Sequence, residues 1–152
     1  MILLDTNVIL EVMTPKPLKA VLDWLDGQRS EALYISTITI AEIGYGLHVL
    51  PKGKRRRTLE DRFDLFISGG FAGRVLSFDQ KAARLYGDLM GRRRKLGKPM
   101  SALDDQIAAI ARAARFALAT RNVRDFADCG LEIVNPFGAL PRDLRRGDSG
   151  NQ

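Results

Sequence analysis

The sequence contains little of the chemistry on which many enzymes and extracellular proteins depend. It has one cysteine, Cys129, and one histidine, His48, among 152 residues. A single cysteine cannot form an intrachain disulfide or a zinc site built from several thiolates. A Ser–His–Asp triad would rest entirely on His48, and nothing in the sequence marks a partner serine. The sequence also lacks a Gly-rich phosphate loop of the P-loop kind.

Long apolar segments are missing as well. No apolar run approaches the ~20 residues that a membrane-spanning helix needs. The apolar N-terminus lacks the basic residues of a signal peptide and is interrupted by Asp5. We therefore expect a cytoplasmic protein with no membrane partner. Hydrophobic residues make up 45% of the sequence and charged residues 28%, a balance typical of a globular protein.

Acidic residues are outnumbered by basic ones. Lys and Arg total 24 against 18 Asp and Glu, which gives a formal net charge of +6 and favours a polyanionic partner. The basic residues gather in three runs, at 52–57, 92–98 and 142–146. Each run alone is consistent with a solvated helix face or loop, but together they favour nucleic acid. We expect RNA contacts at five positions: Lys52, Lys54, Arg55, Arg56 and Arg121.

Short apolar segments alternate with helical patterns along the chain. Buried strands are expected at residues 1–4, 32–35, 74–78, 116–120 and 131–134. Apolar residues at every third or fourth position predict helices at 7–14, 18–26, 37–50, 55–68, 80–96 and 102–115. This alternation predicts βαβ units and an α/β fold around a central parallel sheet. We expect one domain over residues 1–140 and a polar, disordered tail over 141–152.

Three acidic residues stand at element ends or on apolar helix faces. Asp5 ends the first strand, Glu42 lies on the helix after the second, and Asp104 begins the helix that leads into the fourth. Each of these acids could instead have a structural role. Asp5 could be a helix N-cap, and Glu42 could form a buried ion pair with an arginine. Asp104, like Asp105, could simply be an acid that the helix dipole favours in the first turn. Ligands of open parallel sheets bind at the carboxyl ends of the strands. If the strands are neighbours, the carboxylates converge there, and a cation such as Mg²⁺ or Mn²⁺ would relieve their repulsion.

Five stretches together resemble the PIN-domain family, especially the VapC and FitB-like toxins of bacterial toxin–antitoxin pairs. They are MILLDTNVILE at 1–11, STITIAEIGYGL at 36–47, ALDDQIAAIA at 102–111, ATRNVRDF at 119–126 and VNPF at 134–137. They follow the family's order and extend over nearly the whole domain. The resemblance implies a three-layer α/β/α fold around a parallel sheet. It also implies a Mg²⁺- or Mn²⁺-dependent ribonuclease.

The resemblance implies roles for individual residues. It makes Asp5, Glu42 and Asp104 the catalytic, metal-binding acids, with Asp104 rather than Asp105 in the matching position. Thr6 and Asn7 match the family's "DTN" and are implied to orient Asp5 or a metal-bound water.

One position departs from the family's pattern. Many members carry a fourth acid directly after the "TR" pair, where this sequence has Asn122. This leaves open whether one metal ion binds or two. Asp125 could compensate, or Asn122 could hold a water molecule.

The toxin resemblance further implies two protein partners. One is an antitoxin that covers the acidic site, and the other is a second copy of the chain in a homodimer. We expect the dimer contact on apolar helix faces such as 55–67 or 80–90.

Three other functions are left open by the residues. A housekeeping RNA-processing nuclease would use the same site without an antitoxin. A phosphatase of the haloacid dehalogenase class would normally carry a second aspartate where this sequence has Asn7. A non-catalytic nucleic-acid-binding module explains the basic runs but leaves Glu42 on an apolar helix face without an explanation.

Overall fold

A five-stranded parallel sheet forms the centre of the computed structural model, which describes residues 1–138. The strands are β1 (Ile2–Leu4), β2 (Leu33–Ser36), β3 (Val75–Leu76), β4 (Ala117–Ala119) and β5 (Ile133–Val134). Their order in the sheet is β3-β2-β1-β4-β5, so the N-terminal strand is central. A central parallel strand is buried on both faces, which explains why β1 is apolar without polar alternation.

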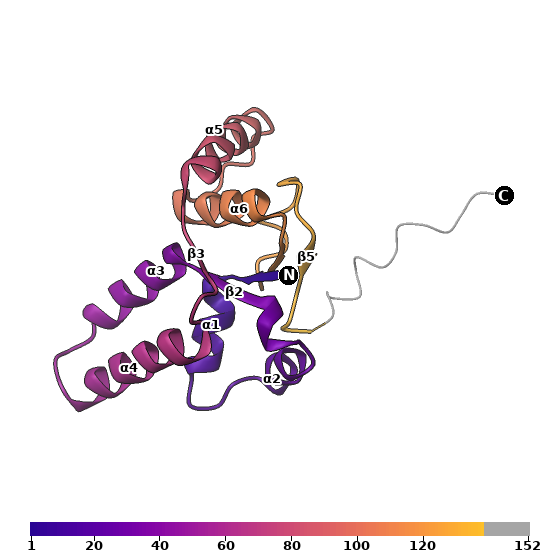
Figure 1. Cartoon of the computed structure of the whole chain (residues 1–152). Helices are drawn as coiled ribbons and strands as arrows, with labels where there is room; N and C mark the ends of the chain where they lie inside the picture. Colours follow the sequence, from indigo (N-terminus) through magenta and orange to yellow (C-terminus); the bar gives the residue numbers. More distant parts are fainter. Residues whose placement is uncertain (139–152) are drawn as a thin grey trace.

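Helices connect the strands and cover both faces of the sheet. They are α1 (Thr6–Met13), α2 (Lys19–Asp26), α3 (Thr37–His48), α4 (Lys54–Leu65), α5 (Gln80–Lys95) and α6 (Ala102–Ala114). In Figure 1, α5 and α6 lie on one side of the strands and α1 to α4 on the other. Successive strand residues point to opposite faces, so Leu3 packs with α5 and α6, whereas Leu4 packs with α1, α3 and α4. The expected three-layer α/β/α fold is confirmed.

Some element boundaries differ from those expected. The segment 74–78 contributes only Val75–Leu76 to the sheet. Arg74, just before the strand, accepts from the N–H of Ile35 at 3.1 Å, and its guanidinium donates to the carbonyl of Leu33 at 2.6 Å. The helix expected over 55–68 ends at Leu65 and is followed by a π-helical turn, η2 (Phe66–Gly70). A short 3₁₀ turn, η1 (Ser30–Ala32), precedes β2.

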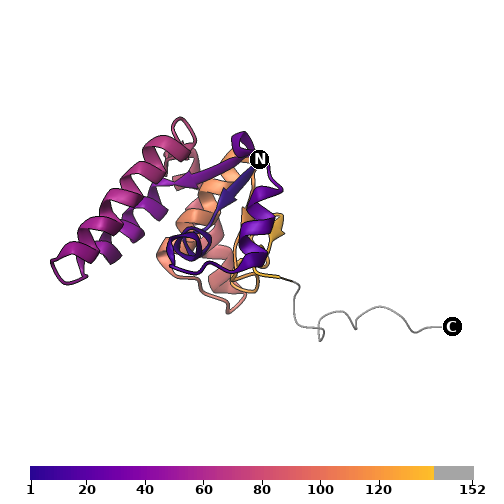
Figure 2. The same ribbon diagram turned by 90° about the horizontal axis from the view of Figure 1, so that it is seen from below.

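Helices α3 and α4 form a hairpin that projects from the rest of the domain in both views (Figures 1 and 2). Its inner face is apolar, with Ile43, Leu47 and Phe63 buried. Its outer surface carries apolar side chains that the domain does not cover, since Tyr45 is 73% and Leu65 71% exposed. The hairpin therefore has both a packed face and an uncovered one.

Two expectations concern where the domain ends and whether any helix could cross a membrane. The expected domain end at 140 and the tail at 141–152 lie outside the described residues. Among residues 1–138, no helix combines the length and the apolar composition that crossing a membrane requires.

Candidate active site

Asp5 lies at the carboxyl end of the central strand. Its main-chain N–H donates to the carbonyl oxygen of Ala119 at 2.9 Å, which extends the pairing of β1 with β4 by one residue. The residue is only 3% exposed. Its Oδ1 accepts from the N–H of Thr6 at 2.7 Å and so caps α1. The N-cap alternative is therefore correct for Asp5, but it occupies only one of the two carboxylate oxygens.

Thr120 holds the other oxygen of Asp5. Leu4 pairs with Ala119 in the register of β1 and β4, so Asp5 and Thr120 follow at the ends of neighbouring strands. Thr120 Oγ1 donates to Asp5 Oδ2 at 2.7 Å, and Thr120 is fully buried. Thr120 was not among the expected site residues. Its place directly after β4, which matches that of Asp5 after β1, is the signal that could have identified it.

Asn7 forms a second contact to the same carboxylate oxygen. Its Nδ2 donates to Asp5 Oδ2 and to Thr120 Oγ1, both at 3.2 Å. Its Oδ1 accepts from the main-chain N–H of Arg121 at 3.2 Å. A carboxamide has distinct donor and acceptor ends, so the contact from Arg121 turns the NH₂ of Asn7 toward Asp5. This geometry supports the expected orienting role of Asn7.

Glu42 reaches the site from α3 and is linked to Asp5 through Thr6. Thr6 Oγ1 donates to Glu42 Oε1 at 2.9 Å, while the N–H of the same residue donates to Asp5. Thr39 Oγ1 lies 2.9 Å from Thr6 Oγ1 and supplies the proton of that contact, since Thr6 has only one hydroxyl proton. Glu42 is half-buried rather than enclosed. Within residues 1–138 it forms no ion pair, so the expected alternative of a buried pair with an arginine is wrong for this part of the chain.

Asp104 completes the cluster from the first turn of α6. Its N–H donates to the Oγ of the N-cap residue Ser101 at 3.1 Å, which leaves its carboxylate free to face the other acids. Burial, with smaller contributions from the charges of Asp104 and Glu42, raises the pKa of Asp5 to about 6 against the hydrogen bonds from Thr120 and Thr6, which lower it. Burial, together with the charge of Asp104, also raises the pKa of Glu42. The three acids thus lie close enough to repel one another.

The donor set of this cluster fits a hard divalent cation. The three acids offer only oxygen ligands, and none of the ion pairs in residues 1–138 neutralises them. In that same stretch, no three or more His, Cys, Asp or Glu side chains are close enough to hold a metal ion by themselves. This wide spacing of the carboxylates suits Mg²⁺, which usually binds one or two carboxylates and keeps several waters for exchange with substrate phosphates.

Asn122 and Asp125 are less closely connected to the cluster. Asn122 contributes its main-chain N–H, which donates to Thr120 Oγ1 at 3.0 Å, while its side chain is exposed. Asp125 is exposed on the following turn. Its main-chain carbonyl accepts from Arg93 Nη2 at 2.8 Å. The compensating role of Asp125 therefore stays a prediction.

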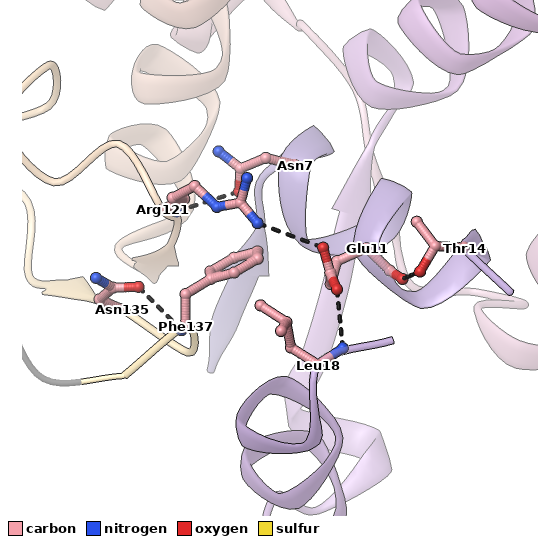
Figure 3. Close-up of polar contacts among 7 residues, drawn as sticks. All are labelled: Asn7, Glu11, Thr14, Leu18, Arg121, Asn135 and Phe137. Atoms are coloured by element: carbon pink, nitrogen blue, oxygen red, sulfur yellow. Dashed lines mark hydrogen bonds and ion pairs between the residues drawn. The ribbon is translucent and has the colours of Figure 1, made fainter. Parts of the chain in front are cut away.

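Arg121 belongs to a polar network (Figure 3) that is connected to Asp5 through Asn7. Its guanidinium donates to Glu11 Oε2 at 3.3 Å and lies 4.0 Å from the ring centroid of Phe137. The other oxygen of Glu11 accepts from the N–H of Leu18 at 2.8 Å. The side chain of Arg121 is half-exposed, with 52% of its surface accessible. The network thus joins α1, the start of α2 and the end of β4.

The remaining basic positions lie around the turn between α3 and α4. Lys52, Lys54 and Arg55 are exposed there. Arg56 is different, because its Nε donates to Glu60 at 2.7 Å, its Nη2 lies 2.8 Å from His48 Nδ1, and its side chain is only 14% exposed. Arg56 therefore stabilises the hairpin, and the other three are the residues accessible to a polyanion.

An apolar groove runs from the acids between α1, α3 and α4. Its volume is about 440 Å³. Its lining includes Leu10, Met13, Leu47 and Leu59, together with Glu42 of the acidic cluster and with Arg55 and Arg62. A partner seated in the groove would therefore also face the acidic cluster.

Comparison with known proteins gives consistent results. The profile of the PIN domain family matches residues 2–130. The chain is 46% identical over 137 residues to the VapC ribonuclease Y4jK of Sinorhizobium fredii, covering 90% of this chain and 98% of that protein. It is 39% identical to the toxin FitB of Neisseria gonorrhoeae, covering 90% and 99%. The solved structure of FitAcB from Neisseria gonorrhoeae matches with a TM-score of 0.86 and 38% identity, covering 91% of this chain and all of that one.

Proposed function

Because the chain belongs to the PIN-domain family, we propose that it is a metal-dependent endoribonuclease acting as the toxin of a toxin–antitoxin pair. The observation that carries this proposal is the cluster of Asp5, Glu42 and Asp104, which repel one another without a neutralising partner in the described part of the chain. Two relatives that match most of the chain are named a ribonuclease and a toxin. A binding module without catalysis would have no use for such a cluster.

In this proposal the three acids bind Mg²⁺ or Mn²⁺ partly through waters of the ion, because within residues 1–138 their side chains are not close enough to hold it by themselves. When bound, the ion would lower the pKa of a water molecule and offset negative charge on the scissile phosphate. Thr120 and Asn7 fix the rotamer of Asp5, and Thr6 holds Glu42 at its side. The site is therefore organised before any ion or substrate arrives.

The basic surface supplies the contacts to RNA. Lys52, Lys54 and Arg55 lie exposed on the hairpin, and such residues bind phosphates without reading the sequence. Arg121 contributes through the exposed half of its guanidinium. Arg56 contributes indirectly, by stabilising the turn that presents its neighbours.

The Asp5→Asn variant tests the proposed nuclease. Asparagine keeps the shape and an acceptor for the N–H of Thr6, so the protein should fold, but Mn²⁺ binding and RNA cleavage should be lost. Purified protein is incubated with total cellular RNA in Mg²⁺, Mn²⁺ or EDTA, and the cleaved ends are sequenced. Asp23→Asn, which changes an exposed acid on α2, is the matched control. Full activity of Asp5→Asn would reject the assignment of the site.

An antitoxin partner is proposed for the apolar groove. An amphipathic helix is the usual occupant of a groove of this kind, and a basic residue beyond the helix could reach Glu42. A housekeeping nuclease would have the same acids but no such partner. A small open reading frame directly upstream of the gene favours the toxin.

A homodimer is proposed on the projecting hairpin. The stripe at 80–90 is used within the domain, since Ala82 and Leu89 are buried in the core with α6. The face at 55–67 is partly uncovered, as Leu65 is 71% exposed. We expect analytical ultracentrifugation to give a dimer that Leu65→Lys weakens. A wild-type protein that stays monomeric at every concentration would count against the dimer.

A further inference from the structure

A second carboxylate lies next to the acidic cluster and has no role in the proposed mechanism. Asp104 and Asp105 are consecutive residues in the first turn of α6, so their side chains point about 100° apart around the helix. Asp104 faces Asp5 and Glu42, whereas Asp105 is fully buried, with no exposed surface.

The surroundings of Asp105 do not satisfy its carboxylate. Within the described chain, neither of its oxygens has a hydrogen-bond partner. Arg93 is close and only 4% exposed, but it donates to the main-chain carbonyls of Asp125 and Ala127, and its Nε is also without a partner among residues 1–138. Buried polar groups are nearly always hydrogen-bonded, because leaving one unpaired is costly. An unpaired carboxylate here requires an explanation.

Asp105 and Arg93 border a cavity between α5, the following loop and α6. Its volume is about 530 Å³, within the ~300–1,000 Å³ of typical small-molecule sites. Most of its wall is apolar and comes from Met90, Pro99 and Met100. An apolar pocket with a few convergent polar groups is the usual form of a ligand site. The neighbouring helix surface exposes Arg92, Arg94 and Lys95, which can bind the phosphates on either side of a base.

We propose that this cavity binds the guanine base of a nucleotide next to the one that is cut. This rests on the proposed nuclease function and specifies its substrate. Burial raises the pKa of Asp105 and the charge of Arg93 lowers it. When ionised beside Arg93, the carboxylate offers only acceptors. Guanine is the one RNA base whose Watson–Crick edge presents two adjacent donors, N1–H and the 2-amino group, and RNA-binding proteins recognise unstacked bases on that edge.

The position of Asp105 explains why a base would lie here. Its neighbour Asp104 faces the acidic cluster at which the phosphate would be cut, and Asp105, the next residue on α6, lines the cavity. Both oxygens of Asp105 are shielded from solvent, and insertion of a base therefore requires a lining side chain to move. Met90 and Met100 can do so, because unbranched methionines adapt readily to a new neighbour.

Binding of mononucleotides tests the pocket without any cleavage. Wild-type protein in EDTA is titrated with GMP, IMP and AMP, and amide shifts are followed by NMR. GMP should bind at least about tenfold more tightly than AMP, the effect of hydrogen bonds to a charged group, and should shift the amides around Met100 and Asp105. IMP, which lacks the 2-amino group, should lie between them. Equal binding of GMP and AMP, or no binding of GMP, would overturn the proposal.

Variants assign the preference to one carboxylate. Asp105→Asn should remove the difference between GMP and AMP, because an amide cannot accept two hydrogen bonds along that edge. Asp128→Asn is the control, since Asp128 is an exposed acid nearby that pairs with Lys98 at 3.0 Å. A preference that survives Asp105→Asn in folded protein would overturn the proposal. The wild-type titration decides it even if the variant does not fold.

Mapped cleavage sites separate this inference from the function on which it rests. The wild type should cut RNA with guanine at one fixed position relative to the cut, and the cuts made by Asp105→Asn should lose that enrichment. Cuts without guanine enrichment would reject the pocket and keep the nuclease. No cuts with Mg²⁺ or Mn²⁺ would reject the nuclease, and the GMP titration would still decide the pocket.

Discussion

Asp5 serves the fold and the proposed site with the same side chain. Its Oδ1 caps α1, and its Oδ2 accepts from Thr120 and Asn7. These contacts are made by neutral donors, so they hold the carboxylate in place without neutralising it. A buried acid held in this way binds its proton more tightly than it does in water. The side chain of Asp5 is therefore positioned to bind a cation, and it lowers the stability of the folded protein when no cation is bound.

The free-energy cost of burying the charged Asp5 carboxylate should appear in the pH dependence of folding. The pKa of Asp5 rises from 3.8 to about 6 on folding. Its proton is thus bound more tightly in the folded state, which favours folding below pH 3.8 and loses that contribution as the pH rises through about 6. In EDTA, the wild type should lose roughly 2 to 3 kcal/mol of unfolding free energy relative to Asp5→Asn over this interval. Urea unfolding at a series of pH values measures it.

The same stability measurement is repeated with Mn²⁺ in place of EDTA. Mn²⁺ should restore the stability of the wild type above pH 6, because a ligand bound only to the folded state stabilises it. It should have no effect on Asp5→Asn. Parallel stability profiles of the two proteins in EDTA would show that the burial of Asp5 costs nothing measurable.

At the scale of secondary-structure elements, Glu11 joins three segments that are distant in sequence. It lies on α1, accepts from the N–H of Leu18 at the start of α2, and pairs with Arg121 after β4. Leu18 is the N-cap residue of α2 and has no side-chain cap of its own. Arg121 in turn orients Asn7 through its main-chain N–H. The position of Asn7 therefore depends, through Arg121, on Glu11, which does not itself contact Asp5, Glu42 or Asp104.

Substitution of Glu11 should affect both stability and cleavage. Glu11→Ala removes the acceptor for Leu18 and the partner of Arg121, so we expect a loss of about 1–2 kcal/mol of unfolding free energy and a lower kcat/KM for RNA. Glu11→Gln keeps an acceptor and should lose less stability. The control is Glu31→Ala, whose pair with Arg29 at 3.8 Å is exposed and should contribute little. If Glu11→Ala and Glu31→Ala have the same stability and the same cleavage activity, the contacts of Glu11 with Leu18 and Arg121 have no functional role.

At the scale of the whole molecule, the hairpin of α3 and α4 brings an apolar groove to the acidic cluster. Leu10 and Leu59 line the groove, and Glu42 belongs to both the groove and the cluster. A partner in the groove would therefore contact Glu42, while most of its contacts would be to side chains outside the acidic cluster. This arrangement allows inhibition and cleavage to be separated by mutation.

Leu10→Lys should separate them. Leu10 is 47% exposed and lines the groove, so lysine should fold normally yet place a charge against an apolar partner. We expect unchanged RNA cleavage but at least about tenfold weaker binding of the protein encoded directly upstream, measured by calorimetry. Leu22→Lys, at a leucine 37% exposed on α2, is the control. Equal affinity of both variants would place the partner elsewhere.

The sequence by itself determined the type of fold and predicted the acids of the proposed site. Alternation of short apolar strands with amphipathic helices is a local pattern, and it predicted the parallel sheet, whereas the resemblance to the PIN-domain family implied the three layers. Asp5 was predictable because a strand end is visible in sequence, and Glu42 because an acid on an apolar helix face is anomalous. Boundaries were less accurate, as at β3, where the side chain of Arg74 binds carbonyls distant in sequence.

Only the tertiary structure decided which residues support the acids. Thr120 and Asp5 are 115 positions apart, and their contact follows from the pairing of β1 with β4, which no local pattern encodes. The roles of Arg56 and Asp105 were equally hidden. A basic run does not show which arginine is paired within the fold, and two consecutive aspartates do not show which one is buried. Burial and pairing depend on neighbours from other elements, and the chain acquires those neighbours only when it folds.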